Sequence, residues 1–97
     1  MQIKPLGKIT VNAKQQVSTT EKFANSLLIK AGSANVGIVW IGDSTLTKAT
    51  GVGVYAYLLS GELFDAASHG LNDISPTDVY LDADTGTDVV FAGIGIR

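Results

Sequence analysis

Apolar and polar residues alternate along most of this chain, and this pattern limits its fold more than any other feature does. The segment 26–31, SLLIKA, places every second residue on one apolar side, and the segments 7–14, 54–59 and 87–96 follow the same pattern. Strict alternation is typical of a β-strand with one buried face, because successive side chains point to opposite sides. Glycine, asparagine and Ser-Pro interrupt these segments about every eight to twelve residues, the spacing of β-sandwiches and small barrels.

The pattern predicts an all-β fold: an antiparallel β-sandwich or a jelly-roll-like small barrel of about seven to eight strands. Ninety-seven residues suffice for one modest core, so residues 1–97 are expected to form a single domain. Residues 1–7, MQIKPLG, contain a proline and little periodicity. We expect either an N-terminal arm that orders only on a neighbouring subunit or a frayed terminus, with the sandwich formed by residues 8–97.

One predicted strand, NVGIVWIG at residues 35–42, is apolar on both sides. Ile38 and Trp40 lie on one side, and Val39 and Ile41 on the other. An antiparallel strand with one solvated face should instead alternate apolar with polar residues. This strand is therefore expected to lie centrally between layers or to be covered by a partner subunit.

Charged residues make up 16% of the chain, well below the roughly 25% of typical soluble domains. Part of the surface is therefore expected to be buried against another chain. Residues 1–48 carry six lysines against Glu21 and Asp43, whereas residues 49–97 carry Arg97 against seven acids. The two halves form either two solvated faces or a basic surface that meets the acidic surface of a neighbour. The lysines are scattered and only one arginine is present, so nucleic-acid binding is poorly supported.

The sequence also narrows the redox chemistry and the location. The absence of cysteine excludes disulfides and thiolate metal sites. No apolar run approaches the roughly 20 residues of a transmembrane helix, and residues 1–10 lack the apolar core of a signal peptide. We expect synthesis in a cytoplasm and no membrane partner.

A short block, GDS at residues 42–44, resembles the nucleophile block of GDSL-type esterases, and GLND at 70–73 resembles the oxyanion block of that family. A serine nucleophile needs a base that takes its proton. The single histidine, His69, precedes the GLND block, whereas in that family it comes long after it. We therefore expect no catalytic residue and no enzymatic activity. Gly42 is expected to end a strand, and the next two residues to cap the turn.

Three aspartates alternate around a glycine in the segment 82–88, DADTGTD. Carboxylates in a tight loop suit hard cations such as calcium, but the positions of this segment do not fit the EF-hand pattern. We expect a β-hairpin instead, with strands 78–82 and 87–96 and a positive φ at Gly86. Binding of a cation by this loop is left open; no metal ligand and no cofactor are assigned.

Five apolar side chains are candidates for contacts with other subunits or a partner protein: Ile3, Leu6, Trp40, Tyr55 and Tyr57. The first two lie in the candidate arm. The two tyrosines share one face of a predicted strand and suit either an interface, where tyrosine is enriched, or ordinary core or rim packing. The single tryptophan is expected to pack in the core or at an interface.

A more specific pattern extends over residues 25–96. Its elements are Asn35, Gly37, VWIG at 39–42, Ser44, LLSGELF at 58–64 and DVYLDADTGTDVVFAG at 78–93. In this order they resemble the small all-β virion proteins of tailed bacteriophages. The chain departs from that pattern in having Trp40 where tyrosine is more usual, and in a longer insertion at 66–77.

The resemblance implies a structural, non-enzymatic role in a virion. The first expectation is a capsid decoration or cement protein that binds the coat lattice, through the major capsid protein or another virion protein, and stabilises the head. Such proteins are commonly homotrimers, and symmetric oligomers suit a chain poor in charge because they bury the same patch on each subunit. The alternative is a tail, fibre or baseplate accessory module that contributes to attachment or assembly. Both place the protein in the virion after synthesis in the host cytoplasm.

Overall fold

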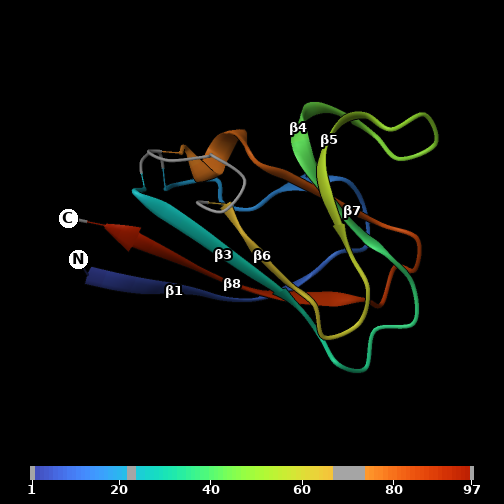
Figure 1. Ribbon diagram of the computed structural model, residues 1–97, viewed down its shortest axis with the longest axis horizontal. Coiled ribbons are helices and arrows are strands. Elements are labelled where there is room, and N and C mark those ends of the chain that lie inside the picture. Colours follow the sequence, from blue (N-terminus) through green and yellow to red (C-terminus); the bar gives the residue numbers. More distant parts are fainter. Residues whose placement is uncertain (1, 22–23, 67–73, 97) are drawn as a thin grey trace.

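The computed structural model describes residues 2–21, 24–66 and 74–96, which form two antiparallel four-stranded sheets (Figure 1). Sheet A has the strand order β1-β8-β3-β6 and sheet B the order β2-β7-β4-β5. The strands of sheet A are β1 (Gln2–Thr10), β8 (Val89–Ile96), β3 (Ser26–Ala31) and β6 (Leu63–Asp65). Those of sheet B are β2 (Gln15–Gln16), β7 (Tyr80–Ala83), β4 (Val39–Thr47) and β5 (Val52–Leu58), and a short 3₁₀ turn, η2 (Pro76–Asp78), precedes β7. The predicted all-β sandwich is confirmed.

The two sheets pack face to face around one apolar core. Alternate residues of β3, namely Leu27, Ile29 and Ala31, are fully buried, as are Val90 and Ile94 of β8, so the predicted alternation is confirmed in both strands. Other large buried side chains come from β4, β6 and β7: Val39, Ile41, Phe64 and Leu81. Removing apolar surface from water contributes about 25 cal/mol per Å², and this layer therefore supplies the main driving force for folding.

The chain changes sheet at almost every connection. Among the described strands, only β4 and β5 are both consecutive in the chain and paired in one sheet. The predicted hairpin of residues 78–82 with 87–96 is therefore wrong: β7 belongs to sheet B and β8 to sheet A, so residues 84–88 form a corner between sheets. Gly86 does not adopt the positive φ predicted for it.

The N-terminal segment lies within sheet A. Residues 2–7 form part of β1 and pair with β8 of the same chain, so that Gln2 lies opposite Ile96. The first and last described strands therefore lie side by side (Figure 1). A bulge between Pro5 and Gly7 interrupts the pairing, and Gly7 has a φ of +84°, which glycine adopts without strain. Proline and a bulge protect this edge strand from pairing with another chain.

The strand with two apolar sides, β4, lies between β7 and β5. It does not end at Gly42, as predicted, but continues to Thr47 with an irregular register. The hairpin that follows folds back toward the outer side of the sheet: Leu46 is buried, and its Cδ1 would lie 3.1 Å from a Cβ placed on Gly42. The chain's own hairpin thus covers part of the outer side of β4.

Candidate interaction surfaces

Three large apolar side chains are exposed together on the outer side of sheet A. Leu28 of β3 is 42% exposed, Leu63 of β6 is 57% exposed and Phe91 of β8 is 49% exposed. Single exposed apolar residues are common on proteins, but a contiguous group rimmed by polar residues marks an interaction site. Together with Lys8 and Lys30 these residues form the sheet A patch.

The strand register makes the sheet A patch contiguous. Lys8, Phe91, Lys30 and Leu63 lie in one row across β1, β8, β3 and β6. Leu28 is two positions from Lys30 on the same strand and therefore lies diagonally next to both Phe91 and Leu63. Opposite and diagonal positions on a sheet face are about 5–8 Å apart, so Leu28 lies close to both Phe91 and Leu63, whereas Lys30 separates those two in their row.

Gly93, which has no side chain, lies on the outer side of sheet A next to this patch. It lies on β8 between Pro5 of β1 and Leu28 of β3. A Cβ placed on Gly93 would meet the carbonyl oxygen of Lys4 at 3.8 Å, an ordinary contact. Packing within the chain therefore does not require glycine here, and its presence leaves the backbone of β8 open to a partner next to Phe91.

The outer side of sheet B carries the three tyrosines and the single tryptophan of the chain. Trp40 of β4 lies opposite Tyr57 of β5, and Gly42 lies opposite Tyr80 of β7. Tyr55 is the extra residue where the β4–β5 register shifts, and it is exposed. Residues that alternate with these rings, among them Val39, Ile41 and Leu81, point into the core. Trp40, Tyr55, Tyr57 and Tyr80 form the aromatic face.

Trp40 is held in place by two contacts. Its ring centroid lies 5.5 Å from that of Tyr57 with the planes tilted by 43°, and its Nε1 donates a hydrogen bond to Asp84 Oδ1 at 3.1 Å. Such ring pairs contribute about 0.5–1.5 kcal/mol beyond the area they bury. Tyr57 nevertheless remains 56% exposed, so a solvent-facing ring lies beside a half-buried, oriented indole.

Lys48 lies near two carboxylates, one of which, Asp84, also accepts the hydrogen bond from Trp40. Its Nζ donates to the carbonyl oxygen of Ala83 at 2.6 Å and lies 3.8 Å from Asp84 Oδ1 and 3.9 Å from Asp82 Oδ1. Lys48 belongs to the turn that follows β4, so the folded-back hairpin brings it to β7. Partly exposed ion pairs contribute at most about 1 kcal/mol, so the main effect of this network is to order polar groups beside Trp40.

A second acidic group lies near Tyr55. Asp43 and Ser44 lie inside β4, so the predicted turn cap at these two residues is wrong. Asp43 instead accepts hydrogen bonds within the strand, from Thr45 Oγ1 and, at 2.8 Å, from Thr45 N. These bonds, side chain first, and the charge of Lys14 hold the pKa of Asp43 below its usual value. Burial, followed by the charges of Asp43 and Asp78, raises the pKa of Tyr55.

The predicted contact residues fall in different places. Trp40, Tyr55 and Tyr57 come together on the aromatic face. Leu6 is half-buried and packs against the edge of the core. The backbone of Ile3 pairs with Gly95, and its side chain lies outside the described part of the structure.

The sheet A patch was missed at the sequence level. A signal for it was present, because Leu28 and Phe91 occupy the side of their strands that the alternation assigns to solvent. A single apolar residue at such a position is ordinary. Only the register shows that the two belong to one surface.

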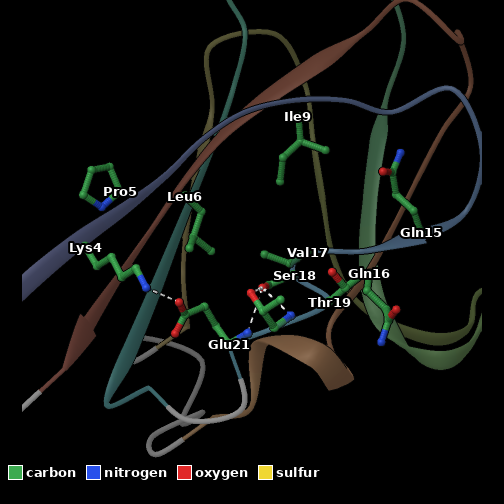
Figure 2. Close-up of a pocket in the computed structure, with 11 residues that line it drawn as sticks. Lys4, Pro5, Leu6, Ile9, Gln15, Gln16, Val17, Ser18, Thr19 and Glu21 are labelled. Carbon is green, nitrogen blue, oxygen red and sulfur yellow. Dashed lines mark hydrogen bonds and ion pairs between the residues drawn. The ribbon is translucent and has the colours of Figure 1, made fainter.

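A cleft of about 500 Å³ lies between the edge strand β1 and the segment 15–21 (Figure 2). Leu6 and Ile9 project into it from β1, and Lys4 and Glu21 form an ion pair at one end. These two are the ionisable residues among those that line the cleft, and they are paired with each other. The cleft is thus a polar-rimmed opening at the edge of the core and lacks a nucleophile–base pair among its lining residues.

The third aspartate of the acidic loop, Asp88, is only 2% exposed. Its carboxylate accepts hydrogen bonds from Val36 N at 3.0 Å and Gly37 N at 2.8 Å. The side chain of Asn35 accepts from Val89 N at 2.9 Å and donates to Val89 O at 2.8 Å. These bonds form a corner clamp that joins the β3–β4 connection to the β7–β8 connection.

The corner clamp separates Asp88 from the other two aspartates of the loop, which lie near Lys48. Within the described ranges no group of three or more histidine, cysteine, aspartate or glutamate side chains is placed to hold a metal ion. The acidic loop therefore stabilises the sandwich through separate contacts.

Ser44 is exposed, and its carbonyl oxygen accepts a hydrogen bond from Lys14 Nζ at 2.8 Å. His69 and the GLND segment at 70–73 lie outside the described residues. The absence of enzymatic activity stays a prediction.

Comparison with known proteins identifies no relative of this chain. No protein-family model, curated protein or solved structure matches this chain. The fold is thus defined by its own strand order, and the likeness to phage virion proteins stays with the sequence motifs. No helix in the part that the structure describes is long and apolar enough to cross a bilayer.

Proposed function

We propose that the protein is a structural component of a virion, a decoration or cement protein that docks on the coat lattice through the sheet A patch. The observation that carries this proposal is the exposed apolar group of Leu28, Leu63 and Phe91 beside Lys8 and Lys30. Protein interfaces combine apolar and charged side chains, and in this patch Lys30 lies between Phe91 and Leu63 while Lys8 flanks Phe91. The lysines favour an acidic rim on the partner, and the virion assignment is supported by the motifs of residues 25–96.

We include self-association in this proposal, with a trimer as the expected form. It is supported by β5, which lies at the edge of sheet B and consists of seven uncharged residues. Edge strands without charge or proline are open to pairing with another chain. Many coat sites occupied at once add up to a large free energy of shell stabilisation, even where each contact is modest.

The location in the particle is tested by the copy number of the protein in purified virions, together with its position in a particle map. On the order of hundreds of copies over the head, as lattice symmetry requires, would support decoration. About six or twelve copies at the tail would instead favour the tail, fibre or baseplate module, again by symmetry. Absence from the virion would contradict both assignments.

The role of the sheet A patch is tested with Phe91→Ser and a matched control, Val36→Ser. Val36 is 79% exposed but lies in the β3–β4 connection, away from the patch. Loss of a central interface aromatic typically weakens binding about tenfold or more, so Phe91→Ser should lower occupancy on particles while Val36→Ser leaves it unchanged. Normal occupancy by a folded Phe91→Ser protein would exclude the patch as the docking surface.

A further inference from the structure

The aromatic face lies on sheet B, whereas the docking surface proposed above lies on sheet A. Trp40 and Tyr57 lie opposite each other on neighbouring strands, with Tyr57 mostly in solvent. Aromatic rings carry a negative π face and bury about 150–250 Å² each when they pack. An exposed ring is therefore a strong anchor for a ligand with a flat apolar side. This surface is independent of the virion assignment.

The ring pair is ordered before any ligand arrives. The indole is oriented by its contact with Tyr57 and by the hydrogen bond from its Nε1 to Asp84. A binding surface that is already in place costs less entropy on binding than one that must be ordered. The two rings lie side by side on one sheet and form an open platform, unlike the enclosing cage that a quaternary ammonium group needs.

Polar groups at the edge of this platform match a ligand rich in hydroxyl groups. The carboxylates of Asp82 and Asp84 accept hydrogen bonds, and the ammonium group of Lys48, between them, donates. The three groups carry a net formal charge of −1, which disfavours phosphate, sulfate and carboxylate ligands. A pyranose ring offers C–H bonds on its flat side and hydroxyls at its edge, and a neutral sugar avoids repulsion by these acids.

We infer that the Trp40–Tyr57 platform binds a neutral carbohydrate, with the sugar ring stacked on Tyr57 and its hydroxyls bonded to Asp84 and Lys48. Binding of this kind would let the outer side of sheet B hold a glycan while the sheet A patch contacts the coat and the edge of β5 pairs with another copy.

The single tryptophan of the chain makes the test direct, because selectively excited tryptophan fluorescence reports on Trp40 alone. The whole chain is titrated with neutral oligosaccharides of glucose, mannose, galactose and N-acetylglucosamine, and separately with oligogalacturonate and phosphocholine. We expect a saturable change with at least one neutral oligosaccharide and none with the two charged probes. A response only to oligogalacturonate or phosphocholine, or no response to any neutral sugar, would overturn the inference.

Two variants separate stacking from other effects. Tyr57→Ala removes the exposed ring and is expected to weaken binding about tenfold or more, in line with the loss of one stacking contact. Tyr57→Phe keeps the ring and should bind within about threefold of the original protein. Phe91→Ser, which removes an exposed ring from the other sheet, should bind normally. Unchanged affinity in a Tyr57→Ala protein with a normal unfolding transition would refute the platform.

Discussion

Replacing Asp88 with alanine is expected to lower the free energy of unfolding by about 2–4 kcal/mol. The estimate follows from the two backbone N–H groups, of Val36 and Gly37, that donate to this buried carboxylate. A hydrogen bond to a charged group contributes about 1.5–3 kcal/mol, and a donor left without a partner costs a similar amount. Partial entry of water keeps the expected total below the sum of the two upper limits.

Asp88→Asn tests the same reasoning with the shape preserved. Its amide oxygen can accept one of the two bonds, but its NH₂ group then faces the other N–H. We expect a loss of about 1–3 kcal/mol, smaller than that of the alanine variant. Asp78→Asn is the matched control, since Asp78 is exposed and the change should stay within about 0.5 kcal/mol.

Urea and thermal unfolding of the three variants provide the measurement. For a domain of this size 1 kcal/mol shifts Tm by about 4–8 °C, so Asp88→Ala should lower Tm by at least about 8 °C. Hydrogen exchange at the amides of Val36 and Gly37 should accelerate in the same variant. An Asp88→Ala protein within about 0.5 kcal/mol of the original, the range of an ordinary surface change, would refute the corner clamp as a source of stability.

Three further outcomes are expected. Gly53→Ala should cost about 2–4 kcal/mol in urea unfolding, because φ is +70° and a Cβ would lie 2.4 Å from Thr45 Oγ1. Gly51→Ala, at φ +77° but with nothing within 4 Å, should cost only about 1 kcal/mol, and equal losses would contradict this account. In an ultraviolet titration the pKa of Tyr55 should lie above its ordinary value, and Asp43→Asn should lower it. Because the folded pKa is raised, the free energy of unfolding should decrease as pH rises from the unfolded pKa of this tyrosine toward the folded one. Tyr55→Phe should remove this pH dependence. Asp43 has a lowered pKa in the folded protein, so its ionised form stabilises the fold above the unfolded pKa, and this stabilisation is lost as pH falls through the folded pKa. In Asp43→Asn the free energy of unfolding should therefore fall less steeply with acidification.

The layers of the sandwich could be predicted from the sequence because alternation is a local property of each strand. Leu27, Ile29 and Ala31 share a side whatever the neighbours of β3 are, and the structure buries all three. The connections could not be predicted in the same way. The residues at 84–88 suit a hairpin turn and a corner between sheets equally well, and the pairing of β8 with β1 and β3 decides between them.

The candidate surfaces were predictable only in part, because they also depend on which strands pair. Trp40, Tyr55 and Tyr57 were identified as contact residues, but Tyr80 and Lys48 join them through the register of β7 and the return of the hairpin. Such neighbours are separated by tens of residues in the chain, and one register shift would move each side chain to the opposite face.

The motif residues Asn35 and Gly37 acquire a physical explanation from the corner clamp. A Cβ on Gly37 would lie 2.8 Å from Thr85 Oγ1 and 3.2 Å from Asp88 Oδ2, so a side chain there would disturb the carboxylate's contacts. This part of the motif serves the fold.

The position of β8 has a consequence for biosynthesis. The ribosome completes this strand after the other seven, yet it lies between β1 and β3 (Figure 1). Until it emerges, β1 has no neighbour in its sheet and the apolar interior stays open along one side. The nascent chain is therefore expected to remain sensitive to proteases and bound by chaperones until β8 has emerged, and a premature stop before residue 89 should yield a degraded polypeptide instead of a smaller sandwich.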